Sequence, residues 1–190
     1  MFVFILPFLV DLASAGSSQP DPPYGYGNAT WDDLLSALST QEEIWLTKSK
    51  LTQGERQCIY WLNNGITGNN YSFDVWSRKK EQMQKIPHVA ELTNETERPA
   101  MKIRYATETP KSAELFELKY WSEQEKCFIL TSTAGACEQH VWKPHIDQMS
   151  SCDDAYAQCS DFTYPVYSDT CINPKPVCVG AQSNCVPKYG

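Results

Sequence analysis

Apolar and polar side chains alternate with a period of two over most of this chain, a pattern typical of half-buried β-strands. Eight segments of strand length show this pattern and are rich in aromatic and β-branched residues. They are Glu43 to Leu51, Gln57 to Ile66, Tyr71 to Arg78, Gln84 to Leu92, Met101 to Thr107, Glu114 to Ser122, Cys127 to Thr133 and Cys137 to Trp142. The Gly- and Asn-rich link from Asn63 to Asn70 and the tight link from Thr133 to Ala136 predict antiparallel neighbours. Because closing eight such strands into a ring removes the exposed edges, we predict an all-β, eight-stranded, antiparallel up-and-down barrel. Pro87 lies within the fourth segment, and because proline cannot donate a ladder hydrogen bond, we expect it to interrupt that strand.

Two segments have helical periodicity. In the first, Thr30 can cap a helix that continues to Leu38, with Asp33 three residues after the cap. The second runs from Ser150 to Cys159 and has acidic residues in its first turn, where the helix dipole favours them. We therefore expect a short N-terminal helix and a C-terminal helix beside the barrel.

The first 15 residues have the composition of a secretory signal peptide: a short apolar run is followed by the small-residue sequence Ala13-Ser14-Ala15. We therefore assign residues 1–15 to a signal peptide, 16–172 to the barrel domain and 173–190 to a Cys- and Pro-rich tail. Three N-glycosylation sequons, at Asn28, Asn70 and Asn94, are consistent with a secreted, extracellular protein.

The chain has 8 cysteines, and all except Cys58 lie between Cys127 and Cys185. In an oxidising compartment an even number predicts four disulfides, whose connectivity the sequence alone leaves open. There is no Cys-x-x-Cys pair, and the 3 histidines lack a metal-ligand spacing, so we predict no metal site.

The formal net charge of −7 argues against nucleic acid and anionic membranes as partners. The sequence contains no Gly-x-Ser-x-Gly, His-Glu-x-x-His or phosphate-binding loop, so we predict a monomeric binding protein without cofactor rather than an enzyme.

An ordered set of short motifs resembles one family. These are the Trp-Asp-x-Leu helix, Trp-Leu-Thr in the first strand, Gln57-Cys58, Tyr120-Trp121-Ser122 ahead of Lys126-Cys127-Phe128-Ile129-Leu130, Cys137-Glu138-Gln139-His140-Val141-Trp142, a spaced Cys152 and Val166-Tyr167-x-x-x-Cys171. Over residues 30 to 172 the chain resembles the salivary lipocalins of ticks, most of all those of hard ticks. The resemblance implies a secreted eight-stranded barrel that sequesters host inflammatory mediators for immune evasion at a feeding site, as the related histamine-binding and leukotriene-binding proteins do.

The resemblance also implies a disulfide pattern. By it, Cys58 pairs with Cys171 and Cys127 pairs with Cys152. The two pairs Cys137–Cys159 and Cys178–Cys185 remain.

The amine-binding branch of that family carries two acids at the positions of Phe128 and His140. A buried amine needs a carboxylate counter-ion, and by the same resemblance Glu117 is the remaining candidate. We therefore expect a lipid mediator, such as a leukotriene or another eicosanoid, to bind better than a biogenic amine such as histamine or serotonin. A third possibility is an antagonist that binds a host protein through the tail or the barrel loops.

Alternation turns the apolar side chains of the third and fifth strands inward. On the sixth strand two arguments disagree: alternation turns Phe116, Leu118 and Tyr120 inward, whereas the family alignment turns Leu115, Glu117, Lys119 and Trp121 inward. His140 is as well explained by a structural hydrogen bond as by ligand contact. Asp74 and Glu138 are expected on the solvated outer face. The candidate ligand-binding residues are Trp61, Phe73, Val75, Ile103, Tyr105, Glu117, Phe128, Leu130, His140 and Trp142.

Overall fold

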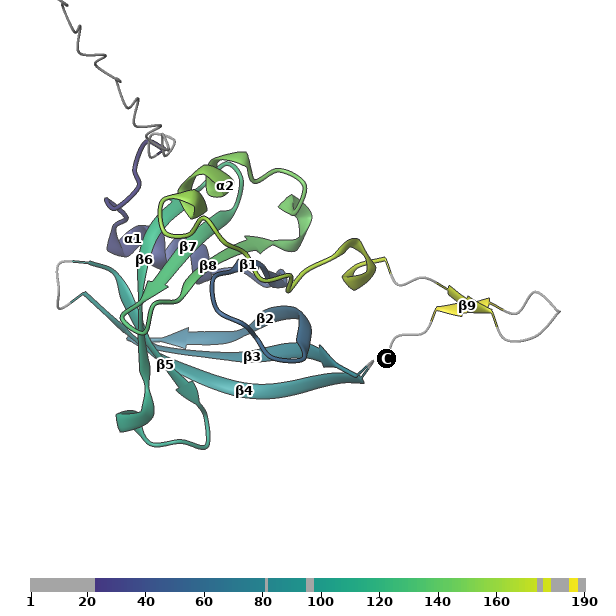
Figure 1. The fold of residues 1–190 in the computed structure, drawn as a ribbon. Coiled ribbons are helices and arrows are strands. Elements are labelled where there is room, and N and C mark those ends of the chain that lie inside the picture. The colour runs from purple at the N-terminus through teal and green to yellow at the C-terminus, as the bar shows by residue number, and fades with distance from the viewer. Residues whose placement is uncertain (1–22, 81, 95–97, 174–175, 179–184, 188–190) are drawn as a thin grey trace, which may run out of the picture.

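Eight antiparallel strands pair in sequence order, and the last pairs with the first to close a barrel (Figure 1). This computed structural model describes residues 23–80, 82–94, 98–173, 176–178 and 185–187; the expected signal peptide lies outside them. The strands are β1 (Ile44–Ser49), β2 (Arg56–Thr67), β3 (Asn70–Lys79), β4 (Gln82–Thr93), β5 (Ala100–Tyr105), β6 (Glu114–Ser122), β7 (Cys127–Ser132) and β8 (Cys137–Trp142). The predicted all-β, up-and-down barrel is confirmed.

Alternation on β3 illustrates how the sequence sorts its side chains. Tyr71, Phe73 and Val75 are buried in the barrel core, whereas Asp74 lies between them on the outer face, 3.4 Å from the ammonium of Lys85. The same period of two along the other strands builds one apolar interior, which requires the strands to keep this register.

Pro87 does not interrupt β4. It is paired with Asp74 of β3, and its carbonyl accepts a hydrogen bond from Ala106 on the β5 side at 3.0 Å. The N–H and the carbonyl of one residue in an antiparallel strand point to the same side. The N–H that Pro87 lacks would therefore face the region beyond Tyr105, where β5 has already ended. No ladder hydrogen bond of β3 is lost.

Helix α1 (Trp31–Leu38) packs against the barrel interior. Its start is a capping box: the hydroxyl of Thr30 accepts from the backbone N–H of Asp33 at 3.2 Å, and the Asp33 carboxylate accepts from the N–H of Thr30 at 2.8 Å. The indole of Trp142 donates to the carbonyl of Ala37 at 3.0 Å, which ties the helix to the end of β8. One end of the barrel is thereby covered.

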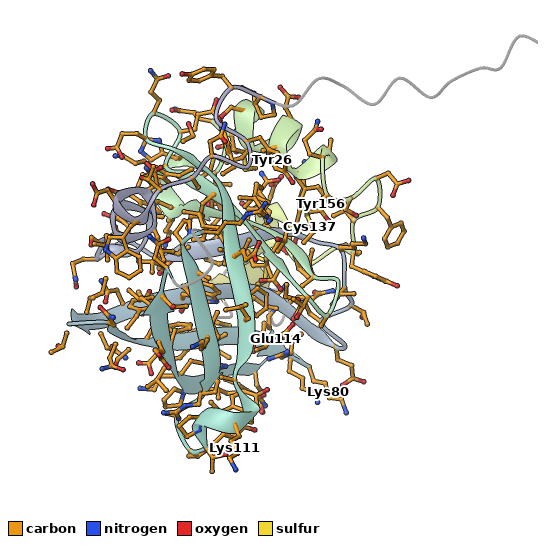
Figure 2. All side chains as sticks on the ribbon, turned by 90° about the vertical axis from the view of Figure 1, so that its left-hand side faces the viewer. Tyr26, Lys80, Lys111, Glu114, Cys137 and Tyr156 are labelled. Carbon is orange, nitrogen blue, oxygen red and sulfur yellow. A yellow bond between two sulfur atoms is a disulfide. The ribbon has the colours of Figure 1, made fainter. Side chains whose placement is uncertain are left out.

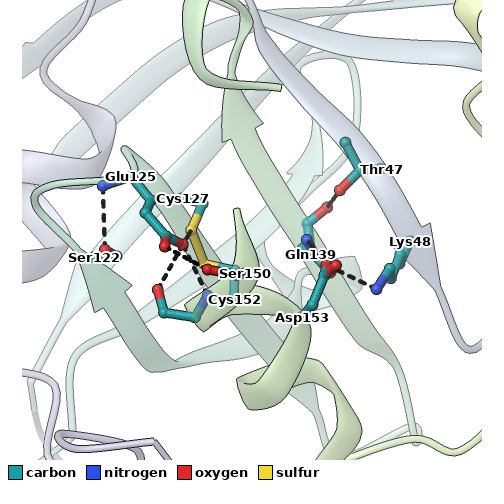
Figure 3. The surroundings of a disulfide bond; sticks show 10 residues. Thr47, Lys48, Ser122, Glu125, Cys127, Gln139, Ser150, Cys152 and Asp153 are labelled. Carbon is teal, nitrogen blue, oxygen red and sulfur yellow. Dashed lines mark hydrogen bonds and ion pairs between the residues drawn. A yellow bond between two sulfur atoms is a disulfide. The ribbon is translucent and has the colours of Figure 1, made fainter. Parts of the chain in front are cut away.

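Helix α2 (Ser150–Ala157) lies on the outer face of β7 and β8, where the disulfide Cys127–Cys152 holds it (Figure 3). A second disulfide, Cys137–Cys159, attaches the residues that follow the helix to β8. The pair implied by the resemblance for Cys127 is thus present, as is the remaining pair for Cys137. Both sulfurs of this segment face the barrel.

Polar contacts add to these disulfides (Figure 3). The Asp153 carboxylate accepts from Lys48 of β1 and from Gln139 of β8, each at 2.8 Å. The Glu125 carboxylate accepts from the N–H of Ser151 at 2.9 Å and so caps the helix from the β6–β7 turn. Helix α2 is therefore bound to three strands and one turn.

The C-terminal segment returns to β2, where the disulfide Cys58–Cys171 closes a separation of 113 residues, as the resemblance implies. Cys58 has a positive φ of 52° at a bulge, and its N–H donates to the carbonyl of Val166 at 2.8 Å. The bulge turns the ladder N–H of this position toward the C-terminal segment.

The remaining elements are short. The 3₁₀ helices are η1 (Pro110–Ser112), η2 (Lys143–His145) and η3 (Asp169–Cys171), and β9 (Pro176–Cys178) pairs with β10 (Cys185–Pro187). The backbone register sets Cys178 opposite Cys185, but their side chains lie outside what the structure describes, so their disulfide stays a prediction. Among the described residues, no helix has the length and apolarity needed to cross a membrane.

Candidate ligand-binding site

A cavity of about 340 Å³ lies inside the barrel at the end opposite α1. Its rim comes from the β1–β2, β5–β6 and β7–β8 connections, which an up-and-down barrel places at the same end. Figure 2 shows Lys111 on the β5–β6 connection and Glu114 where β6 begins. The lining residues are Leu46, Leu51, Thr52, Gln53, Arg56, Ile59, Trp61, Phe73, Val75, His88, Ile103, Arg104, Tyr105, Glu108, Ser112, Glu114, Phe116, Ala136 and Glu138.

Half of the predicted site residues line this cavity. They are Trp61, Phe73, Val75, Ile103 and Tyr105. The Trp61 and Phe73 rings lie 4.9 Å apart and form a continuous aromatic wall across β2 and β3. Such a wall suits a flat or elongated apolar group.

Four other predicted site residues belong to the barrel core but are not on the cavity wall: Phe128, Leu130 and His140, which are fully buried, and Trp142, which is half-buried. The rings of Phe128 and His140 stack at 5.0 Å, and the imidazole of His140 lies 4.3 Å from the Trp61 ring. These side chains therefore fill the barrel interior next to the cavity instead of lining it. His140 is fully buried.

Glu117 does not line the cavity, contrary to expectation, because β6 contains a bulge. Leu118 is paired with Leu130 and Tyr120 with Ile129, so Lys119 is an additional residue. Before the bulge, Phe116 and Leu118 point inward, as alternation predicts. After the bulge, Trp121 points inward, as the alignment predicts. Tyr120 instead packs on the outer face of the barrel, in the apolar cluster that contains Cys127 and Cys152.

The Glu117 carboxylate consequently contacts Arg98, at 3.4 Å, and Lys119. These two cations, the lysine first, hold the pKa of Glu117 below its usual range. Glu117 therefore forms ion pairs on the outer face of the barrel, with Arg98 and Lys119.

Glu138 lines the cavity, although we expected it on the outer face. Its carboxylate accepts a hydrogen bond from Nε2 of His140 at 3.2 Å, and Nε2 of Gln53 lies 3.5 Å from its other oxygen. Its side chain is only 13 % exposed. The signal was present in the sequence, because a strand that turns His140 and Trp142 inward must also turn Glu138 inward.

His88 is another polar residue of the lining that the sequence did not predict. It lies on the cavity wall between Phe73 and Tyr105, with ring separations of 5.5 and 4.8 Å. Burial lowers the pKa of its imidazole, and Arg56 acts in the same direction. The carbonyl of Ile86, 2.8 Å from Nδ1, acts oppositely, as do the acids Glu108 and Asp74.

Charges of both signs surround the mouth. Three acids, Glu108, Glu114 and Glu138, share the lining with Arg56 and Arg104. The Arg104 guanidinium donates to the carbonyl of Glu108 at 2.7 Å. The lining is therefore apolar and aromatic with polar groups at its rim. Among the described residues, no three His, Cys, Asp or Glu side chains come together as a metal site requires.

The Tyr71 hydroxyl and Nδ1 of His140, both inside the barrel, are among the buried polar atoms that have no hydrogen-bond partner in the described part of the chain. Burial raises the pKa of that hydroxyl far above its usual value. Buried polar atoms of this kind normally form a hydrogen bond with an ordered water molecule or with a polar group of a ligand.

Comparison with known proteins identifies the fold. No family model and no curated protein matches the sequence. The crystal structure of AM182 in complex with serotonin is similar with a TM-score of 0.56 and 16 % identity, over 73 % of this chain and 91 % of that one. Japanin from Rhipicephalus appendiculatus, bound to cholesterol, has a TM-score of 0.50 and 12 % identity, over 69 % and 96 % of the two chains. Both are tick lipocalin-type barrels. This chain therefore has the lipocalin fold, in the eight-stranded form that these two tick proteins share.

Proposed function

We propose that this protein is a secreted binder that sequesters a small host mediator in its barrel cavity. A volume of about 340 Å³ fits a small organic molecule, and the walls are aromatic and aliphatic. Proteins of the same fold hold serotonin and cholesterol. Three disulfides among the described residues agree with an oxidising, extracellular setting. Binding at stoichiometric concentration would remove a mediator at a feeding site without any chemistry.

We infer that an aromatic amine is the ligand class that the cavity fits best, and Glu138 carries this inference. A desolvated ammonium needs a carboxylate, and Glu138 offers one that is largely shielded from water, in the cavity that the Trp61 ring also lines. The expectation of a lipid rested on the missing acids at the positions of Phe128 and His140 and on an apolar interior. With Glu138 on the cavity wall, the first of these two reasons no longer applies.

A lipid mediator is the second candidate, and the aliphatic part of the lining favours it. Leu46, Ile59, Val75, Ile103 and Phe116 all line the cavity. Burial of a hydrocarbon chain contributes about 0.8 kcal/mol per methylene group. Arg56, at the rim, could pair with a carboxylate.

Calorimetry decides between these candidates. We expect serotonin to bind more tightly than leukotriene B4 or arachidonate at pH 7.4, with native mass spectrometry giving the stoichiometry. Quenching of tryptophan fluorescence would report occupancy beside Trp61. Tight eicosanoid binding with no uptake of serotonin or histamine would reverse the order, and binding of neither class would refute small-mediator sequestration.

A further inference from the structure

His88 and Glu138 lie on opposite walls of the cavity. In a closed ring of eight strands, β4 and β8 are four strands apart in either direction. His88 is on β4, Glu138 is on β8, and both line the same cavity. A ligand that contacts both must therefore span the barrel.

The hydrogen bond that His88 makes fixes which ring nitrogen carries the proton. Nδ1 lies 2.8 Å from the carbonyl oxygen of Ile86, and a carbonyl can only accept, so Nδ1 is the donor. In the neutral ring Nε2 is then an acceptor. The lowered pKa of His88, caused first by burial, favours this neutral form at pH 7.

Nε2 of His88 has no hydrogen-bond partner among the residues that the structure describes. The rings of Phe73 and Tyr105 hold the imidazole from its two neighbouring strands. Because the other nitrogen bonds to the strand's own backbone, Nε2 is the polar atom that the ring can offer to a ligand.

We propose that Nε2 of His88 selects ligands that carry an O–H or N–H donor at the end remote from their ammonium group. The proposal rests on the proposed function, since Glu138 holds the ammonium and His88 accepts the donor across the cavity. The favoured class is the ring-hydroxylated aromatic amine. A carboxylate at the rim, such as Glu114, could also accept this hydrogen, so the test must separate the two acceptors.

The test compares two matched pairs of amines by calorimetry at pH 7.4: serotonin with tryptamine, and tyramine with phenethylamine. Each pair differs by one hydroxyl group. We expect the wild-type protein to prefer the hydroxylated member by about 3- to 10-fold, as one neutral hydrogen bond contributes. His88→Phe retains a flat ring between Phe73 and Tyr105 but has no acceptor, so the preference should fall to about one while tryptamine affinity is kept.

The matched control is His145→Phe, which makes the same exchange at a residue that does not line the cavity. It should retain the preference. A measurement without mutation covers the case that His88→Phe does not fold: the ¹⁵N resonance of Nε2 should shift when serotonin binds and stay unchanged with tryptamine.

The outcomes separate the two proposals. Equal affinity within each pair, or a preference that survives His88→Phe, would overturn the role of His88 while amine binding itself stood. An Nε2 resonance that shifts equally with both ligands would do the same. If wild type binds none of the four amines, the amine function fails and the selectivity proposal fails with it.

Discussion

Replacing Glu138 with glutamine tests the counter-ion role most directly. The amide has almost the same size as the carboxylate, and its oxygen can still accept from Nε2 of His140, which now lies 3.2 Å from the acid. The exchange therefore removes one negative charge from the cavity wall and changes the size of the side chain very little.

The size of the effect follows from the burial of Glu138. A hydrogen bond between charged groups contributes about 1.5 to 3 kcal/mol, and two unit charges 4 Å apart attract by about 4 kcal/mol at an effective dielectric constant of 20. The side chain is 13 % exposed, so solvent screens it little, whereas the cost of desolvating the ammonium offsets part of the attraction. We expect a loss of about 2 kcal/mol, or roughly 30-fold in Kd for serotonin.

Asp74→Asn is the matched control. Its carboxylate is similarly buried, at 15 % exposure, and belongs to the same barrel, but it faces outward and pairs with Lys85. Both variants lose one negative charge, so a comparison of their serotonin affinities separates the effect of the charge's position from the effect of net charge. The affinities are measured by calorimetry at pH 7.4, and melting temperatures verify that both variants fold. If Glu138→Gln stays within about twofold of wild type, or if Asp74→Asn weakens binding equally, the counter-ion assignment is wrong.

Three further predictions concern titration and cross-linking. The affinity for serotonin and the free energy of unfolding should both fall as the pH drops below about 6.5, because the folded protein favours the neutral imidazole of His88. In His88→Phe, calorimetry and thermal melts from pH 7.5 to 5.5 should show a weaker dependence of both quantities on pH. Tyr60, whose pKa is raised to about 12 by burial and by Glu43, should titrate about two units above an exposed tyrosine, so stability should decline between about pH 10 and 12; absorbance at 295 nm of Tyr60→Phe should lack this late step. Replacing Cys58 and Cys171 together by serine should lower the free energy of unfolding by up to about 4 to 5 kcal/mol, since their bond closes a 113-residue separation; urea unfolding measures the loss, and an unchanged midpoint would contradict it.

The barrel could be predicted from the sequence because alternation is a local signal repeated on every strand. Phe73 and Val75 point inward for the same reason that Asp74 points outward, and the turn residues of the links fix the antiparallel order. The Thr30 cap and both helices could be predicted because capping chemistry and helical periodicity involve neighbouring residues only.

The site could be predicted only in part, because bulges and the depth of a cavity are properties of the assembled barrel. The additional residue Lys119 shifts the face of β6 between Leu118 and Trp121, and no local pattern announces it. How far the cavity reaches into the barrel depends on which large side chains meet at its inner end. The inward orientation of Phe128 and His140 could therefore be predicted, but not that the cavity ends before it reaches them. Glu138 differs from these residues, because alternation with His140 and Trp142 on β8 is sufficient to predict that it points inward.

The disulfides divide the barrel into two arcs of four strands each, β7–β8–β1–β2 and β3–β6. The three disulfides among the described residues attach to β2, β7 and β8. The sequence has no cysteine between Cys58 and Cys127, so β3 to β6 are joined by hydrogen bonds and packing alone. Glu138 belongs to the cross-linked arc and His88 to the other. In evolution, substitutions on β3 to β6 could therefore change which distal group of a ligand is recognised, while the frame that presents the acid stays covalently fixed.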